Sequence, residues 1–303
     1  MPERSPKNLD RHWIIAPPCA DANDSITWSE ICGLPCIVEL LKRNKFGGAD
    51  EVSAFLQPRL RALSDPFQLH NMEAAVTRIF QAIDGGERIV VFGDYDVDGV
   101  TSLALLAEML RSYGAEPELF LPLRMEEGYG LSPESVERCC AQHHPKLLIA
   151  VDCGTSSLTE IATLKQRGVD VIVLDHHEPK SALPDCVAMV NPKTETNSAF
   201  GYLCSVGIVF KLCHALLKTR PAPNFDLRAS LDLVALGTVA DIVPLEKENR
   251  IFVQRGMLEL AKSKRHGVRK LMEVAAVRSP VMAEHIGFRL GPRLNAAGRI
   301  ANA

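Results

Sequence analysis

The stretch "VVFGDYDVDGVTS" (residues 90–102) places three aspartates at alternate positions directly after a run of valine and phenylalanine. Its apolar start, within the segment RIVVFGD (residues 88–94), predicts a buried β-strand. Carboxylates as close together as those of Asp94, Asp96 and Asp98 repel one another, and a bound cation lowers the cost of keeping them ionised at neutral pH. The end of this strand is therefore a candidate metal site.

Three familiar motifs that place acids or glycines in a loop do not fit this stretch. An EF-hand loop needs a preceding helix and a glutamate at its twelfth position, but a strand precedes Asp94 and the twelfth position is Leu105. The GxGxxG dinucleotide fingerprint and the GxxxxGK[ST] phosphate loop are both missing after the strand. A plain turn accounts for one aspartate, not for three.

Short apolar runs alternate with amphipathic segments after this strand. We expect strands at residues 88–94, 116–122, 146–152, 169–177 and 186–192, and helices at residues 100–114, 132–143 and 157–168. Strands that are almost continuously apolar and separated by helices predict an α/β fold with a mostly parallel β-sheet flanked by helices. Residues 205–218, 227–243 and 248–262 predict a mainly helical segment that follows.

The chain of 303 residues, 47% of them hydrophobic, is long enough for one large domain or two ordinary ones. We expect a poorly ordered polar lead-in (residues 1–29), a helical preface (30–86), the α/β domain (87–245) and a helical segment (246–303). Within the preface, amphipathic helices are expected at residues 34–44, 51–63 and 71–84, the last with Asn71 as its N-cap.

Composition limits the classes of function. The net charge of -3 excludes a global basic field, so any contact with a polyanion must be local. The nine cysteines are odd in number and form no CxxC pair, which favours a reducing compartment over a disulfide framework. With no signal-like start and no apolar run of about 18 residues, we expect no membrane association and a cytoplasmic location.

Polar residues follow two further strands of the expected sheet. Asp152 ends the strand LLIAV, and Asp175, His176 and His177 follow the strand VIVL. In an open parallel sheet, ligands bind outside the carboxyl ends of the strands. We therefore expect these groups to meet the three aspartates of the first strand at one rim.

Asp241 lies in the otherwise apolar segment GTVADIVPL (residues 237–245). A buried aspartate is costly to ionise unless it is paired or binds a cation. From the residues alone, Asp241 is either the cap of a turn that leads to Pro244 or a metal ligand from a fourth segment. A group of carboxylates with one or two imidazoles suits two ions of Mn²⁺ or Mg²⁺, which would clamp a phosphoryl oxygen and activate water for phosphoester hydrolysis.

The motifs GDYDVDG, VDCG, LDHH and GTVADIVPL, in this order, resemble those of the DHH phosphoesterase superfamily. In detail, the sequence is similar to that of the RecJ single-strand-specific exonucleases. The segments EGYGLSPESV, SVGIVFKL, ENRIFVQRG and GPRLNAAGRI also resemble that family, and the resemblance extends from about residue 34 onward. The resemblance implies a Mn²⁺- or Mg²⁺-dependent exonuclease that degrades single-stranded DNA from its 5′ end to mononucleotides in recombination and repair. We expect a monomer, with single-strand-binding protein and a helicase as partners.

The resemblance also implies roles for the residues of the rim. The expected metal ligands are five carboxylates and one imidazole: Asp94, Asp96, Asp98, Asp152, His176 and Asp241. Asp96 and Asp98 would each hold one ion, and Asp152 would bridge the two ions and act in catalysis. Many pyrophosphatase-like members begin the first motif with a histidine, which VVFGD lacks here, so Asp94 or water would replace it.

His177 would be catalytic, contacting the scissile phosphate or its leaving group, while Asp175 would orient an imidazole. The segment GPRLNAAGR supplies Arg293, Asn295 and Arg299 as candidates for substrate binding. The basic run KSKRHGVRK (residues 262–270) is better explained as a solvated helix end.

RecJ proteins continue into a second domain, DHHA1, and often into an OB-fold, and we expect both to be missing from this chain, which stops at GRIANA. Two alternatives therefore stay open. One is a DHH phosphoesterase that acts on short oligonucleotides, cyclic dinucleotides or pyrophosphate. The other is a catalytically incompetent, truncated DHH scaffold, although every acid of the motifs is present.

Overall fold

The computed structural model describes residues 17, 19, 33–44, 46, 48–180 and 182–300, without the side chains of residues 124, 125, 299 and 300. Its contacts divide the chain into two compact units, Met1–Gln57 and Pro58–Ala303. The predicted lead-in lies almost entirely outside the described residues. The four-part division proposed from the sequence stays a prediction.

The described part of the smaller unit contains two helices, α2 (Pro35–Arg43) and α3 (Ala49–Leu56). The helix expected over residues 51–63 is broken: α3 ends at Leu56, and a separate 3₁₀ turn, η1 (Leu60–Ala62), follows. Pro58 explains the break, because a proline disfavours helical backbone in the residue before it. Gln57 accordingly leaves the helix with φ -127° and ψ 66°.

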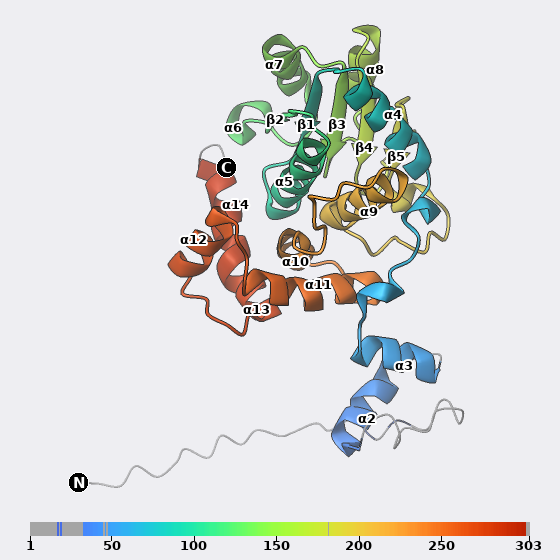
Figure 1. Ribbon diagram of the computed structural model, residues 1–303, viewed down its shortest axis with the longest axis vertical. Helices are drawn as coiled ribbons and strands as arrows, with labels where there is room; N and C mark the ends of the chain where they lie inside the picture. Colours follow the sequence, from blue (N-terminus) through green and yellow to red (C-terminus); the bar gives the residue numbers. More distant parts are fainter. Residues whose placement is uncertain are drawn as a thin grey trace, which may run out of the picture. The chain divides into compact units, whose positions relative to one another are not determined.

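A five-stranded parallel sheet forms the centre of the larger unit (Figure 1). Its strands lie in the order β2-β1-β3-β4-β5, and each neighbouring pair is parallel. Their bounds are β1 (Ile89–Phe92), β2 (Glu118–Phe120), β3 (Leu147–Val151), β4 (Asp170–Leu174) and β5 (Ala188–Val190). The predicted α/β fold with a parallel sheet is confirmed.

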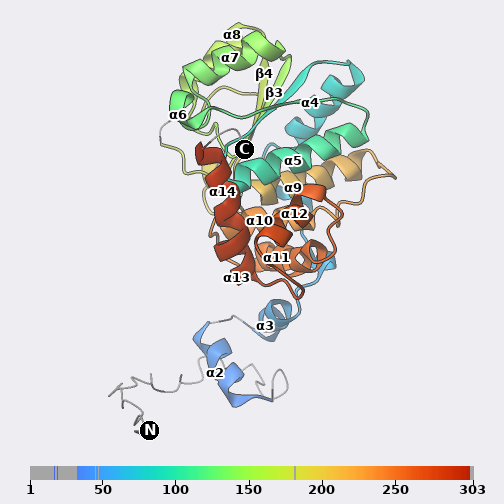
Figure 2. The same cartoon turned by 90° about the vertical axis from the view of Figure 1, so that its left-hand side faces the viewer.

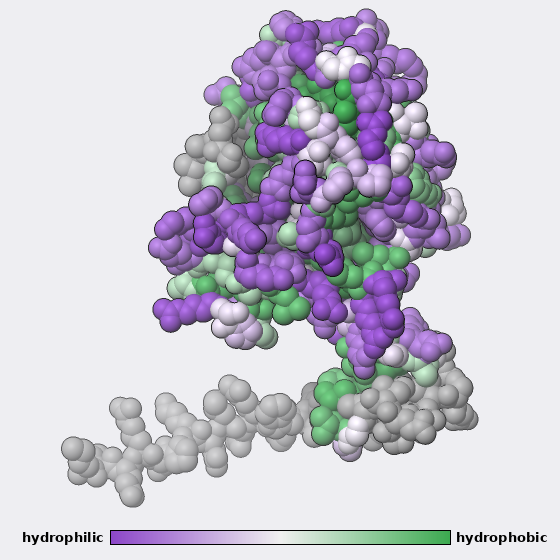
Figure 3. Space-filling model, in the orientation of Figure 1, coloured by the Kyte–Doolittle hydropathy of each residue, from purple (hydrophilic) through white to green (hydrophobic). Residues whose placement is uncertain are grey.

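Helices cover both faces of the sheet. Alternate side chains of β1 enter different cores: Ile89 and Val91 belong to one, and Val90 and Phe92 to the other. The first core includes α4 (Met72–Asp84), α5 (Val97–Ser112) and α9 (Ser205–Thr219), and the second includes α7 (Pro133–His143) and α8 (Leu158–Gln166). In Figure 3, hydrophilic residues cover much of the visible outer face of this unit, as expected where apolar side chains point inward.

The remaining elements are short turns and a helical layer beyond the carboxyl ends of the strands (Figure 1). They are η2 (Pro66–Gln68), α6 (Arg124–Glu127), η3 (Pro192–Thr194), α10 (Leu231–Ala240), α11 (Lys247–Leu260), α12 (His266–Val274), α13 (Ala283–His285), the π-helical η4 (Ile286–Leu290) and α14 (Gly291–Ile300). Among the described residues, no helix combines the length and apolar character needed to cross a membrane.

The start of α5 differs from the prediction, whereas the start of α4 matches it but lacks a side-chain cap. Helix α5 begins at Val97, three residues before the expected start, because the Asp96 side chain accepts a hydrogen bond from the Gly99 backbone and caps the helix. Asn71 does occupy the N-cap position of α4, but its side chain does not cap the helix. The backbone of Asn71 lies in the left-handed region (φ 59°), and its Nδ2 donates to the Met189 carbonyl on β5.

Gly237 allows α10 to lie close to the start of α5. A Cβ atom at this position would meet Thr101 Oγ1 at 2.6 Å and Val206 Cγ1 at 2.7 Å, both closer than real Cβ contacts. The same atom would lie 3.0 Å from Asp98 Oδ1. A glycine is therefore needed where α10 approaches the predicted metal ligands.

We expect Gly237→Ala to lower the free energy of unfolding by about 1–3 kcal/mol, the usual cost of overpacking a tight core. Gly267→Ala is the matched control, since Gly267 also lies in a helix but a Cβ there meets nothing within 4 Å. It should gain about 0.5–1 kcal/mol from helix propensity. Urea unfolding of both variants measures the difference, and equal shifts would contradict the packing argument.

Candidate metal centre

The three aspartates lie in the segment that leads from the end of β1 into the first turn of α5, which we call the aspartate loop (residues 94–98). A Cβ atom on Gly99 would come within 2.4 Å of the Asp94 carbonyl oxygen, so only glycine allows the chain to fold back this closely. Asp96 Oδ1 accepts from the Gly99 backbone at 3.1 Å. Asp98 lies in the first turn of α5 and is buried with Asp94.

The start of α9 holds two of the buried carboxylates. Asp98 Oδ2 accepts from the Ser205 backbone at 2.7 Å, and Asp98 Oδ1 accepts from the Val206 backbone at 2.8 Å. The Ser205 hydroxyl donates to Asp152 Oδ1 at 2.9 Å. These N–H groups have no partner within the helix, and the positive end of the helix dipole favours a negative charge at this point.

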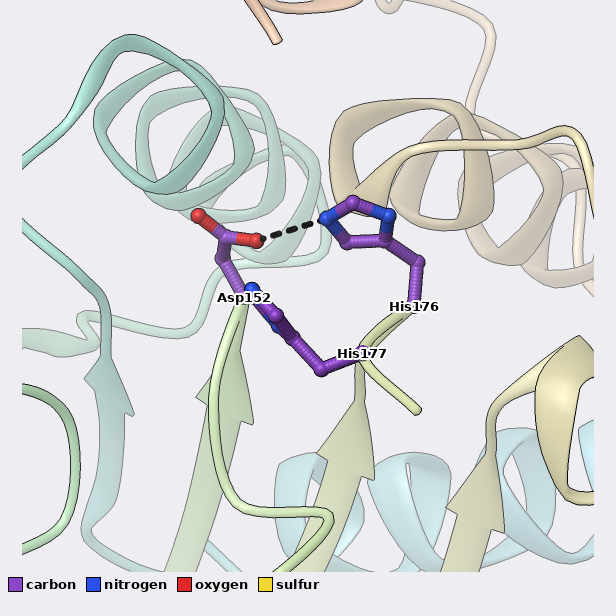
Figure 4. A group of neighbouring side chains, drawn as sticks. All are labelled: Asp152, His176 and His177. Carbon is purple, nitrogen blue, oxygen red and sulfur yellow. Dashed lines mark ion pairs between the residues drawn. The ribbon is translucent and has the colours of Figure 1, made fainter. Parts of the chain in front are cut away.

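His176 lies among three of the carboxylates. Its Nε2 is 3.4 Å from Asp152 Oδ1, 3.5 Å from Asp241 Oδ2 and 3.8 Å from Asp98 Oδ2. Figure 4 shows that the side chains of Asp152, which follows β3, and His176, which follows β4, approach each other at the carboxyl ends of the strands. Asp241 is the C-cap residue that follows α10. Residues from four segments of the chain thus meet at one rim.

Several buried polar atoms of this group lack hydrogen-bond partners. Within the described part of the chain, both ring nitrogens of His176 and Asp241 Oδ2 are shielded from solvent and make no hydrogen bond. Such atoms are costly to bury. A divalent cation bound by Asp241 Oδ2 and one ring nitrogen of His176 would compensate for much of this cost.

The spacing of the ligand atoms also fits cations. Three groups of side chains each bring their ligand atoms within 4.8 Å of one another: Asp94, Asp96 and Asp152; Asp98, His176 and Asp241; and Asp152, His176 and His177. The donors are mostly carboxylate oxygens with imidazole nitrogens, a set that suits Mn²⁺ and Mg²⁺ better than a metal that prefers thiolates. The residues present therefore fit the two ions predicted from the sequence.

The pKa values of the group reflect its burial and its like charges. Burial and the charge of Asp241 raise the pKa of Asp98 to about 7, and burial and Asp96 raise the pKa of Asp241 to about 6. Burial and Asp98 raise the pKa of Asp152 well above its ordinary value. Burial and the neighbouring His177 lower the pKa of His176 to about 4, which keeps this imidazole neutral, the form that binds metals.

His177 has a different environment from His176, because half of its side chain is exposed. Its Nδ1 donates to Asp175 Oδ1 at 2.7 Å, and this hydrogen bond raises the pKa of His177. Burial opposes ionisation of Asp175, but the hydrogen bonds from His177 and Thr155 outweigh it, and the pKa of Asp175 is lowered. Asp175 thus lies where it can orient the His177 imidazole, and the role expected for it from the sequence stays a prediction.

Four polar residues of the rim were not predicted. Besides Ser205, they are Thr155, whose backbone N–H and hydroxyl both donate to Asp175 Oδ2, and Asn191, whose Nδ2 donates to Thr155 Oγ1 and to the His177 carbonyl. The fourth is Tyr129, whose hydroxyl donates to the Asp152 carbonyl and lies 3.1 Å from His177 Nε2. Asn191 directly follows β5, so the rule used for the other strand ends could have found it.

The three candidates for substrate binding all lie on α14. Arg293 is exposed, and its Nη1 donates to the Arg289 carbonyl at 2.7 Å. Asn295 Oδ1 accepts from the Val97 backbone, next to the aspartates, at 3.0 Å. The side chain of Arg299 lies outside the described residues. Their role toward a substrate stays a prediction.

Comparison with known proteins now places the chain in a family. Residues 88–238, which include the whole sheet and most of the rim, match the family described as "DHH family, N-terminal domain". The chain belongs to the DHH family.

Within this family the similarity is to RecJ. The chain is 38% identical to the single-stranded-DNA-specific exonuclease RecJ of Bacillus subtilis strain 168 over 293 residues, which are 96% of this chain and 36% of that protein. A crystal structure of exonuclease RecJ bound to manganese has a TM-score of 0.71 and 34% identity, covering 80% of this chain and 60% of that one. A structure of RecJ in complex with Mg²⁺ from Thermus thermophilus has a TM-score of 0.60 and 27% identity, covering 90% of this chain and 36% of that one.

The resemblance to the RecJ exonucleases that the motifs indicate is thus confirmed. This chain spans about a third of the length of the Bacillus relative, at 36%.

We expect Asp241→Asn to be more thermally stable than the wild type in EDTA at pH 8, because the substitution removes a carboxylate that burial and Asp96 make hard to ionise. The folded-state pKa of about 6 lies above the ordinary value of 3.8, so the protonated form stabilises the fold below about pH 4 and this contribution is lost as the pH rises through 6. The advantage of the variant should therefore shrink at pH 5.

In Mn²⁺ the wild type should be more thermally stable than Asp241→Asn. An ion at 100 times its Kd adds about 2.7 kcal/mol to the stability of a chain that binds it, and the variant lacks one of the proposed ligands. Melting curves followed by circular dichroism in EDTA and in Mn²⁺ measure both effects. Asp226→Asn, which changes an exposed aspartate, is the control and should shift neither curve. A wild type that melts above Asp241→Asn in EDTA at pH 8 would contradict this account.

Proposed function

We propose that this chain carries the catalytic centre of a metal-dependent exonuclease that hydrolyses the phosphodiester bonds of single-stranded DNA, from the 5′ end to mononucleotides. The observation that carries the proposal is the meeting of five carboxylates and His176 at the carboxyl ends of parallel strands. It is supported by the similarity to proteins named single-stranded-DNA-specific exonuclease and to RecJ structures with manganese or Mg²⁺.

Two ions are proposed, held by two groups of ligands with Asp152 between them. Asp94 and Asp96 would contribute to one group, and Asp98, His176 and Asp241 to the other. When bound, the ions supply positive charge that stabilises phosphoryl oxygens and acidifies water. Asp98 and Asp152 keep their positions before an ion binds, because the start of α9 already donates hydrogen bonds to both.

His177 is the proposed proton donor. Asp175 holds its Nδ1–H, so the ring orientation is fixed and Nε2 is left to face the site. The Tyr129 hydroxyl donates a hydrogen bond to the Asp152 carbonyl, so the hydroxyl oxygen can accept a hydrogen bond from His177 Nε2 when the imidazole carries both protons. The raised pKa of His177 favours that form. His177 would exchange Tyr129 for a phosphate oxygen or the leaving oxygen of the substrate.

The wider role also belongs to the proposal. We place the activity in recombination and repair in the cytoplasm, with the protein as a monomer and with single-strand-binding protein and a helicase as partners, as the resemblance implies. Residues 87–245 would form the catalytic domain. Arg293 and Arg299 on α14 would bind the DNA backbone through their positive charge.

The direct test is hydrolysis of a labelled single strand. In Mn²⁺ the chain should release labelled mononucleotide from the 5′ end of a single-stranded oligonucleotide at the earliest times, and a 3′-labelled strand should shorten only gradually. EDTA or Asp96→Ala should stop the release, because each removes part of the proposed ion site. A duplex or a dinucleotide should be cut far more slowly, and faster cleavage of the dinucleotide would favour a small-molecule phosphoesterase.

We expect His177→Ala to lower kcat by about 10²–10⁴-fold, the usual contribution of a positioned acid or base, with a smaller change in KM. Calorimetric Mn²⁺ binding should persist, because His177 is proposed to act on the substrate rather than to hold an ion. His266→Ala, at an exposed histidine on α12, is the matched control. Loss of Mn²⁺ binding in His177→Ala would show that His177 is a ligand instead.

A further inference from the structure

Helix α14 reaches the aspartate loop through the side chain of Asn295. The Asn295 Oδ1 atom accepts from the backbone N–H of Val97 at 3.0 Å. Val97 is the first residue of α5, so this N–H is one of the donors that the helix itself leaves without a partner. Asp96 satisfies a second such donor, the N–H of Gly99. Two side chains, 199 positions apart in the sequence, therefore share the capping of α5.

A second contact between α14 and the loop lies at Gly298. A Cβ atom there would come within 2.7 Å of the Tyr95 carbonyl oxygen and 3.1 Å of its Cβ atom. Tyr95 stands between Asp94 and Asp96, so the backbone of α14 lies directly against the backbone that carries them. Figure 2 shows α14 beside the start of α5.

These contacts act on backbone rather than on carboxylates. Asn295 fixes the amide of Val97, which lies between Asp96 and Asp98, and Gly298 limits where Tyr95 can move. Metal affinity depends on how well the ligands are held before the ion arrives, and groups that hold ligands change that affinity by about 10–100-fold when they are removed. The neutral amide of Asn295 accepts the N–H without adding a further negative charge beside the aspartates.

We propose that Asn295 is a positioning residue of the metal centre and that α14, through Asn295 and Gly298, sets the geometry of the aspartate loop. This inference rests on the proposed function, because it assumes that the loop binds divalent ions. It differs from the role expected from the sequence, in which Asn295 binds the substrate. A positioning role changes metal affinity in the absence of DNA, whereas a substrate contact does not.

The experiment is calorimetric titration of the chain with MnCl₂ in the absence of DNA. We expect Asn295→Ala and Gly298→Ala each to bind Mn²⁺ about tenfold more weakly or worse. Asn295→Asp keeps an acceptor for the Val97 amide and should bind at least as tightly as the wild type. Ala297→Gly is the matched control: it weakens α14 at an exposed position between the two contacts and should stay within twofold of the wild type.

The outcomes separate the inference from the proposed function. A wild type that takes up no Mn²⁺ would overturn the proposed function. A wild type that binds Mn²⁺, with Asn295→Ala and Gly298→Ala binding equally well, would overturn only the role of α14. If Asn295→Ala binds single-stranded DNA more weakly in EDTA but keeps its Mn²⁺ affinity, the positioning role is overturned and the substrate-binding role of Asn295 is supported instead. If Asn295→Ala does not fold by circular dichroism, Gly298→Ala decides through the independent contact.

Discussion

Hydrogen bonds from the first residues of α9 to Asp98 and Asp152 are the interaction on which the rest of the site depends. Two backbone N–H groups and one hydroxyl hold carboxylates that burial and mutual repulsion would otherwise make difficult to keep together. The interaction requires β3, the start of α5 and the start of α9 to converge, and the parallel sheet provides this convergence by directing its strand ends to one side. His176 and Asp241 then complete the set of proposed ligands, which no single segment of the chain could supply.

Most of the fold could be predicted from local patterns. Continuous apolar runs identified all five strands, and the intervening amphipathic segments required parallel pairing. Two of the errors arose where one side chain decided between two local structures. Asp96 extends α5 by capping it, and Pro58 ends a helix whose apolar periodicity continues past it. The side chain of Asn71 bonds to a strand more than a hundred residues away, so no local rule could have assigned its partner.

The candidate site, like the fold, could be predicted only where a local pattern marks a residue. Asp152, Asp175 and the two histidines follow from the rule that ligands gather at the carboxyl ends of parallel strands. Ser205 and Asn295 do not, because their partners lie 107 or 198 positions away and a serine or asparagine near a helix carries no signal of what it will contact. The resemblance to RecJ pointed to the segment that contains Asn295. It did not indicate that the amide holds backbone beside the aspartates.

The raised pKa values of the buried carboxylates have a consequence for the life of the protein in a cell. A centre whose acids repel one another without a cation makes the folded chain less stable when divalent ions are scarce. Marginal folds are removed by cellular proteases, and a change of about 1–2 kcal/mol is enough to alter abundance several-fold. For a chain that binds divalent ions at this centre as proposed, a shortage of these ions would therefore reduce how much of the protein a cell retains, and not only how fast each copy works.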